Sequence, residues 1–310
     1  MNPPYQYDAV FAAQRYHSKR KTRIRWRSHT PAFLFLAPAL ILFGLFAWFP
    51  ILKAVAMSFN NVTLAGQYTW EGLDNYALML KDPAFLAAWG NSMQFAAWSM
   101  LGFLLPVTMA VLIREMRHAR GFFRVVYFLP TVVPSAIAII IWRFIYDPDA
   151  GFLNALLAAI GGTPQNWLND PNLVKPSLVL MMTWGAFGTT ALIYLATLNE
   201  IPTELYEAAE LDGAGPLQRI RFITVPYLVP VMSAMLILQV ISVMQVFTEP
   251  FLMTRGGPGR ETLTPALHIY NKSFVQTDLG YAAAWSVTMV VVLLVFSLIY
   301  RAVNNRLENV

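Results

Sequence analysis

The stretch Glu207-Ala208-Ala209-Glu210-Leu211-Asp212-Gly213, followed by Ala214-Gly215-Pro216, is a long polar interruption between two strongly apolar segments. It carries helix signals of its own. Pro202 suits the first position of a helix, where the missing N–H has no partner to lose. Glu204 lies in the first turn, where the helix dipole favours a negative charge. The stretch therefore predicts a helix that runs from Pro202 to Asp212.

The end of this predicted helix is also encoded in the sequence. Gly213 stands where a left-handed residue would terminate the helix, and Gly215-Pro216 can begin another. A helix of this length is marginal in water, so other parts of the molecule must hold it in place. We predict two short helices at an angle that lead directly into a hydrophobic segment.

The composition is that of an integral membrane protein. The chain is 57% hydrophobic and 13% charged, whereas soluble domains contain roughly 25% charged residues. The net charge of +5 does not indicate nucleic-acid binding, because membrane proteins keep basic residues on the cytoplasmic side. The sequence contains no Cys, which excludes disulfides and Cys-based metal sites.

Six apolar segments are each long enough to cross about 30 Å of hydrocarbon as a helix. The third contains Pro130 and Pro134, which we expect to kink it. We predict an all-α fold in which a six-helix transmembrane domain, residues 31–310, follows a basic tail, residues 1–30. The predicted spans are 31–58, 89–113, 122–146, 176–198, 223–248 and 281–300.

The distribution of Lys and Arg predicts the orientation of these spans. With the N-terminus inside, fifteen of these residues fall on the cytoplasmic side and seven on the outer side. The positive-inside rule therefore places both termini, and the polar stretch at about 199–222, in the cytoplasm.

Sequence motifs for catalysis are absent. There is no phosphate-binding loop ending in Gly-Lys-Ser/Thr, no catalytic constellation, and no metal-ligand spacing among the four His residues. The interiors of the apolar segments also lack ionisable residues; Lys53, Arg143 and Glu249 fall near the outer ends. Proton-driven transporters often place such groups deep in the membrane, so energy for transport would come from another source.

Two spans instead carry neutral polar and aromatic residues at helical spacing. In the fourth span, Thr183, Phe187, Thr190 and Tyr194 fall within about 60° of one another, and Trp184 flanks this face. In the fifth span, Gln239, Ser242, Gln245 and Glu249 lie within about 120° of one another. Such faces should point into the protein, either for hydrogen bonding between helices or along a solute pathway. Hydroxyl and amide groups with aromatic faces suit a neutral sugar. The candidate pathway residues are Thr183, Trp184, Phe187, Thr190 and Tyr194 in the fourth span, and Gln239, Ser242 and Gln245 in the fifth.

The polar stretch resembles the "EAA loop" in permease subunits of binding-protein-dependent ABC importers. The shared pattern is Glu-Ala-Ala, three residues, Gly213, nine residues and Ile223-Thr224-Val225-Pro226, with Val225 where the family usually has Leu. The resemblance runs from about residue 31 to the C-terminus. Further segments look like the carbohydrate class of these permeases: Gly72-Leu73-Asp74-Asn75-Tyr76, Leu195-Ala196-Thr197-Leu198 with Ile201-Pro202, Thr254-Arg255-Gly256-Gly257-Pro258 and Gly280-Tyr281-Ala282-Ala283-Ala284.

This resemblance implies a type I importer permease that is not itself an enzyme, in a bacterial or archaeal cytoplasmic membrane. The expected partners are a second homologous permease, a dimer of ATP-binding-cassette ATPases and an extracytoplasmic solute-binding protein. ATP and Mg would bind to the ATPases, with no cofactor in this chain. The loop residues implied to couple to the ATPase are Glu207, Ala208, Ala209, Asp212, Gly213 and Gly215.

Two other classes of function remain as alternatives. A secondary transporter or channel for a small neutral solute predicts buried charges or inverted repeats, and the sequence contains neither. A membrane-embedded enzyme is a weaker alternative, because no catalytic constellation is present.

Overall fold

The computed structural model describes residues 26–62, 66–116 and 119–308. The chain divides into two units, Met1–Lys53 and Ala54–Val310, and each is considered by itself. The first unit contains helix α2 (Trp26–Phe43), a π-helical turn η2 (Gly44–Trp48) and the beginning of α3 (Phe49–Met57). The apolar segment Leu34–Met57, whose last four residues belong to the second unit, is long enough to span a membrane. Helix α2 thus begins within the predicted tail, and residues 1–25 of that tail lie outside the described residues.

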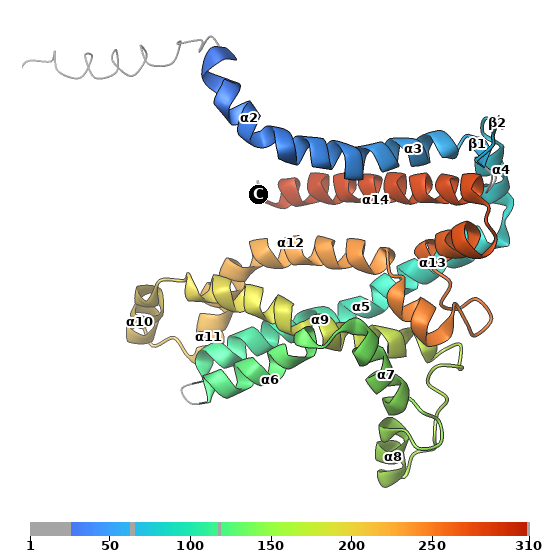
Figure 1. Ribbon diagram of the computed structural model, residues 1–310. Coiled ribbons are helices and arrows are strands. Elements are labelled where there is room, and N and C mark those ends of the chain that lie inside the picture. Colours follow the sequence, from blue (N-terminus) through green and yellow to red (C-terminus); the bar gives the residue numbers. More distant parts are fainter. Residues whose placement is uncertain (1–25, 63–65, 117–118, 309–310) are drawn as a thin grey trace, which may run out of the picture. The chain divides into compact units, whose positions relative to one another are not determined.

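Four long helices form the framework of the second unit: α5 (Pro83–Glu115), α9 (Val174–Asn199), α12 (Val225–Met244) and α14 (Leu279–Glu308). Helix α5 packs along α9, and α12 contacts both (Figure 1). Counting the first unit, five helices of the described chain are long and apolar enough to cross a membrane, and six if one bent pair forms a single span. The fold is that of a multi-pass helical membrane protein.

The third span differs from the prediction of one kinked helix. It consists of α6 (Arg120–Val132) and α7 (Ser135–Ile145), whose axes differ by 99°. Pro134 lies at the break with extended backbone, φ −55° and ψ 137°. Proline has no N–H to donate and disfavours helical geometry in the residue before it. Pro134 therefore interrupts the helix rather than merely bending it, whereas Pro130 lies within α6.

The fifth span is shifted relative to the predicted range of 223–248. It begins with the short helix α11 (Pro216–Arg219) and the π-helical turn η3 (Ile220–Thr224), and it ends at Met244. Gln245 is therefore the residue that ends the helix, with φ −100° and ψ 11°, and not part of a helical stripe. The backbone turns here toward η4 (Pro250–Thr254).

Short elements connect the long helices at the end of the second unit that lies opposite α10 and α11 (Figure 1). Strands β1 (Asn60–Val62) and β2 (Tyr68–Trp70) pair antiparallel, with Asn60 opposite Trp70. This ribbon was not anticipated in the all-α prediction. The remaining short helical elements are α4 (Asp74–Lys81), α8 (Phe152–Ala159), α13 (Pro265–Tyr270) and η5 (Asn271–Val275).

Two buried clusters fix the positions of α5, α6, α7, α9 and α12. The first surrounds Trp142, Tyr146 and Leu178, and the second surrounds Ile113, Tyr194 and Leu228. Close approach of α6 to α9 depends on Gly188, where a Cβ atom would lie 2.8 Å from the carbonyl oxygen of Tyr127. Small residues allow such contacts between membrane helices. Residues from both clusters border the cavity described next.

Candidate functional site

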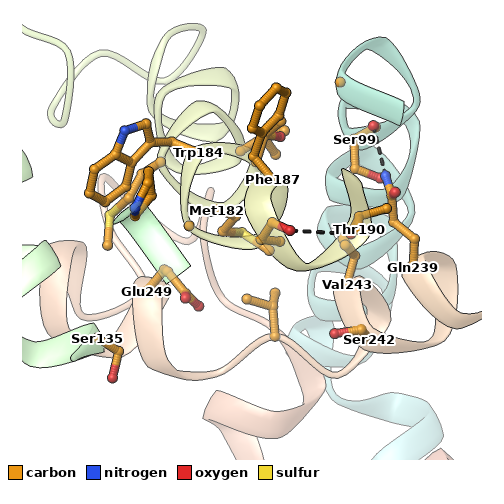
Figure 2. Close-up of a pocket in the computed structure, with 18 of the residues that line it drawn as sticks. Ser99, Ser135, Met182, Trp184, Phe187, Thr190, Gln239, Ser242, Val243 and Glu249 are labelled. Atoms are coloured by element: carbon orange, nitrogen blue, oxygen red, sulfur yellow. Dashed lines mark hydrogen bonds between the residues drawn. The ribbon is translucent and has the colours of Figure 1, made fainter. Parts of the chain in front are cut away.

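A cavity of about 650 Å³ lies between α5, α6, α7, α9, α12 and the segment after α12. Seven of the eight predicted pathway residues line it, and Figure 2 shows several of them around the open space. The cavity therefore brings together the two polar stripes of the fourth and fifth spans. The seven residues are Thr183, Trp184, Phe187, Thr190, Gln239, Ser242 and Gln245.

Part of the polar lining is engaged within the protein. The Gln239 amide nitrogen donates to the Ser99 carbonyl oxygen on α5 at 2.9 Å. The Thr190 hydroxyl donates to the carbonyl oxygen of Ala186 at 3.2 Å, and Gln245 donates to its own helix. Both Gln side chains keep a carbonyl oxygen that can accept from a ligand hydroxyl. Helix–helix bonding and ligand binding are thus compatible at these residues.

Two aromatic side chains on α9 border the same space. Trp184 contacts Trp142 edge to face, with ring centroids 5.8 Å apart. Phe187 makes a similar contact with Tyr127 at 6.2 Å. These neighbours hold the rings from behind and leave part of each ring at the cavity. Aromatic faces beside amides and hydroxyls are the chemistry expected for binding a sugar ring.

Tyr194 does not belong to the cavity, contrary to the prediction. Its side chain is fully buried within the second cluster, together with Ile113 and Leu228. Tyr194 lies one helical turn beyond Thr190, where α5 and α12 pack directly against α9. The helical spacing placed Tyr194 on the correct face, but the gap between helices closes before that turn.

Five polar lining residues were not among the predicted pathway residues: Ser99, Thr131, Ser135, Thr248 and Glu249. Ser99 and Thr131 lie on α5 and α6, where isolated hydroxyls carry no periodic signal. Glu249 lies beyond the end of the span, and burial raises the pKa of its carboxyl, partly opposed by a hydrogen bond to its own backbone. Its position on the extended polar stripe of the fifth span was visible in the sequence.

The predicted short helix in the polar stretch is α10 (Thr203–Leu211). Pro202 precedes it as the N-cap instead of occupying its first position. Gly213 has φ +80°, and the N–H groups of Gly213 and Ala214 donate to the carbonyl oxygens of Glu210 and Ala209. These two bonds form a Schellman motif, which ends a helix with a left-handed residue. The predicted left-handed termination at Gly213 is confirmed.

The next helix begins as the sequence predicted. Gly215 precedes α11 and Pro216 is its first residue. The Gln218 side chain accepts a hydrogen bond from the Gly215 N–H at 2.8 Å. Arg219 pairs with Glu210 at 3.1 Å, which links α11 back to α10. The hydrogen bond and the ion pair together stabilise the turn between α10 and α11.

Helix α10 presents one side to solvent. Glu207, Ala208 and Asp212 are exposed, whereas Ala209 is half-buried. Leu211 is 90% exposed, and Leu217 on α11 is 83% exposed. Exposed leucines next to acidic side chains form a surface suited to a protein partner. We refer to Glu207, Ala208, Leu211 and Leu217 as the loop surface.

The opposite side of α10 is tied to the helix bundle through Tyr206. Its hydroxyl lies 2.9 Å from Oγ1 of Thr224 and accepts a hydrogen bond from Arg114 at 3.1 Å. The Arg114 guanidinium also lies 4.5 Å from the centre of the Tyr206 ring. Because Arg114 lies in the last turn of α5 and Thr224 precedes α12, α10 is linked to two helices that line the cavity. The contacts of Tyr206 with Arg114 and Thr224 were not predicted from the sequence.

Comparison with known proteins supplies the family context. A sequence profile for the family described as "Binding-protein-dependent transport system inner membrane component" matches residues 102–309. The chain is 34% identical to the probable ABC transporter permease protein YurN of Bacillus subtilis, over 86% of this chain and 93% of that protein. It is 31% identical to the arabinooligosaccharides transport system permease protein AraP of the same organism, over 86% of each.

The fold also matches a solved structure. A bacterial ABC transporter involved in the import of the acidic polysaccharide alginate contains a chain that superimposes with a TM-score of 0.81. The two chains are 25% identical, and the match covers 91% of this chain and 98% of the other.

Proposed function

Since the chain belongs to the family of binding-protein-dependent transport system inner membrane components, we propose that it is the membrane-spanning permease subunit of an ATP-driven carbohydrate importer. The observation that carries this proposal is the cavity between the helices, in which amides, hydroxyls and the rings of Trp184 and Phe187 face one space. A sugar presents hydroxyls to the first two groups and an apolar ring face to the third.

The proposed assembly assigns the energy source to a partner. A dimer of ATP-binding-cassette ATPases would bind ATP and Mg and hydrolyse the nucleotide, and one of its subunits would dock on the loop surface. A second, homologous permease would complete the pathway, and an extracytoplasmic solute-binding protein would deliver the carbohydrate. The exposed Leu211 and Leu217 support the docking proposal, because apolar side chains gain most from burial against a partner.

Tyr206 provides a route from ATP hydrolysis to the cavity. Movement of α10 would displace Thr224 and Arg114, and with them the ends of α12 and α5. Gln239 on α12 donates to Ser99 on α5 inside the cavity, so a shift between these helices changes the lining itself. Alternating access needs two such arrangements whose populations the nucleotide state controls.

The test of the assembly is purification of the tagged chain from its native host in mild detergent. We expect a co-purifying ATPase with a Gly-Lys-Ser/Thr phosphate-binding loop, and ATPase activity that depends on a carbohydrate-loaded binding protein. The double substitution Leu211→Asp, Leu217→Asp should remove the ATPase while the chain stays in the membrane. Transport that persists without any ATPase subunit and follows an ion gradient would overturn the proposal.

We further propose a bacterial or archaeal cytoplasmic membrane as the location, with both termini and the loop surface in the cytoplasm. The excess of basic residues on that side supports this orientation. Reporter fusions after Val310 and within residues 249–280 test it. The first should report cytoplasm and the second the outer side; an outside reading at Val310 would contradict the topology.

A further inference from the structure

The cavity lining contains a carboxyl group. Glu249 follows α12 and precedes η4, and it is half-buried. Among the described residues that line the cavity, it is the single ionisable one. Figure 2 shows its carboxyl pointing toward the open centre, opposite the α9 side chains.

Within the described chain, the carboxyl of Glu249 has no partner other than its own backbone. Glu249 stands at the N-cap of η4, but its side chain forms no capping hydrogen bond. Of the ion pairs between described residues, none includes Glu249. Buried carboxylates are normally paired or hydrogen-bonded. An unpaired one that faces a cavity is available to a ligand.

From this arrangement we propose that Glu249 makes the cavity selective by charge, accepting neutral and amino sugars and rejecting acidic ones. The inference rests on the proposed carbohydrate function. A carboxylate accepts hydrogen bonds from sugar hydroxyls and attracts a protonated amine. It repels a uronate carboxylate, and this repulsion is stronger at a partly buried site than in bulk water.

The similar proteins belong to transport systems for acidic and for neutral carbohydrates. The alginate importer takes an acidic polysaccharide, whereas AraP belongs to a transport system for arabinooligosaccharides, which are neutral. The fold therefore does not decide the charge of the substrate. The lining of this chain offers acceptors and a carboxyl and, within its described part, no Lys or Arg that would neutralise an acidic sugar.

The experiment measures equilibrium binding to the purified importer complex in nanodiscs. Three trisaccharides of similar size serve as probes: neutral maltotriose, the fully deacetylated chitotriose, which is cationic, and trimannuronate, which is anionic. Each is measured with the wild-type chain and with Glu249→Gln, which removes the charge and keeps the shape. Glu249→Asp keeps the charge, and Asp149→Asn removes an exposed carboxylate outside the cavity.

We expect the wild type to bind chitotriose most tightly and trimannuronate least. Glu249→Gln should raise the affinity for trimannuronate relative to maltotriose by about tenfold, which is a modest effect for one nearby charge. Glu249→Asp and Asp149→Asn should leave this ratio within about twofold of the wild type.

An unchanged ratio in Glu249→Gln, with at least one trisaccharide bound, would overturn the charge selectivity and leave the carbohydrate function standing. An equal change in Asp149→Asn would also overturn it, because the effect would then be a long-range one. Absence of binding by all three probes in every variant would overturn the carbohydrate function together with this inference.

Discussion

The phenol oxygen of Tyr206 lies 2.9 Å from Oγ1 of Thr224, across the junction between α10 and the span that carries Gln239 and Ser242 of the cavity lining. Thr224 is almost completely buried, so the contact is shielded from competing water. A hydrogen bond in such a place is both stronger and more costly to leave unmade than one at the surface. It links α10 directly to the residue that precedes α12.

We expect Tyr206→Phe to separate ATP hydrolysis from transport. The aromatic ring stays in place, so the loop surface and ATPase attachment should be preserved. Loss of the hydroxyl removes hydrogen bonds worth roughly 0.5–1.5 kcal/mol each, and uptake should fall about threefold to tenfold. The measurement is the amount of substrate transported per ATP hydrolysed in proteoliposomes.

Tyr227→Phe is the matched control, because Tyr227 is an exposed tyrosine near the beginning of α12. It should behave like the wild type. Equal transport per ATP in Tyr206→Phe and the wild type would show that α10 moves α12 by another route.

A side chain at Gly213 should weaken attachment of the ATPase. The φ of +80° is costly for other residues, by roughly 1–2 kcal/mol, and an added Cβ meets no neighbouring atom. Gly213→Asp should therefore disturb only the turn between α10 and α11. We expect that less ATPase co-purifies with this variant and that uptake is lower, while the chain stays in the membrane. Glu207→Lys should have the same effects, because it reverses a charge on the loop surface.

Gly161 offers a close control for this substitution. It has φ +79° and equally open surroundings, but it lies in the loop after α8. Gly161→Asp carries the same backbone penalty away from the loop surface. If it lowered ATPase recovery as much as Gly213→Asp, general destabilisation would explain both.

The sequence predicts most of the loop and much of the cavity because both follow local rules. Gly213 and Pro216 determine turns through their own backbone preferences. The polar stripe of α9 follows from helical periodicity, which identifies a face correctly. These properties depend on residues close together in the chain.

Other features depend on contacts that the sequence pattern does not contain. Tyr194 shares the face of Thr190, yet it is buried because α5 and α12 close the gap at its level. The partner of Gln239 is a backbone carbonyl on α5, 140 residues away. Likewise, the 99° break between α6 and α7 shows that Pro134 ends a helix where the apolar pattern continues, although the helix accommodates Pro130.

The cavity residues give a prediction for transport. Combined Trp184→Ala and Gln239→Ala should nearly abolish uptake, since one change removes a ring face and the other an amide group. Each single change should be milder, about threefold to tenfold for a lost neutral hydrogen bond. Uptake and binding-protein-stimulated ATPase activity are measured after the assembly of the complex has been verified.

Tyr194→Phe serves as the comparison, because the Tyr194 hydroxyl is buried and has no hydrogen-bond partner among the described residues. We expect no effect on uptake. Full uptake in the assembled Trp184→Ala, Gln239→Ala variant would mean that these side chains serve helix packing and that the solute contacts lie in the partner permease.

A final prediction concerns pH and the short helix α13, outside the spans. Burial, together with the nearby positive charges of Lys272 and Arg260, lowers the pKa of His268 to about 4, and Asp82 at 3.8 Å opposes the shift only in part. The unfolded chain has an ordinary His pKa near 6.5. Between about pH 6.5 and pH 4 the unfolded state therefore binds more protons, and stability falls as the pH falls.

The size of this effect follows from the shift. At pH 5 the neutral His268 lowers the free energy of unfolding by about 2 kcal/mol relative to neutral pH, since each pKa unit corresponds to about 1.4 kcal/mol. Asp82 contributes differently: burial raises its pKa, but hydrogen bonds from Ala84 and Tyr281 and the neighbouring positive charges outweigh this and lower it. Its contribution is therefore lost only as the pH falls below the ordinary Asp range.

Thermal unfolding of the detergent-solubilised chain at pH 7.5 and pH 5 should accordingly show a smaller loss of stability in His268→Gln than in the wild type. Equal losses in the two proteins would mean that His268 does not remain neutral in the folded state, and that another group carries the acid sensitivity.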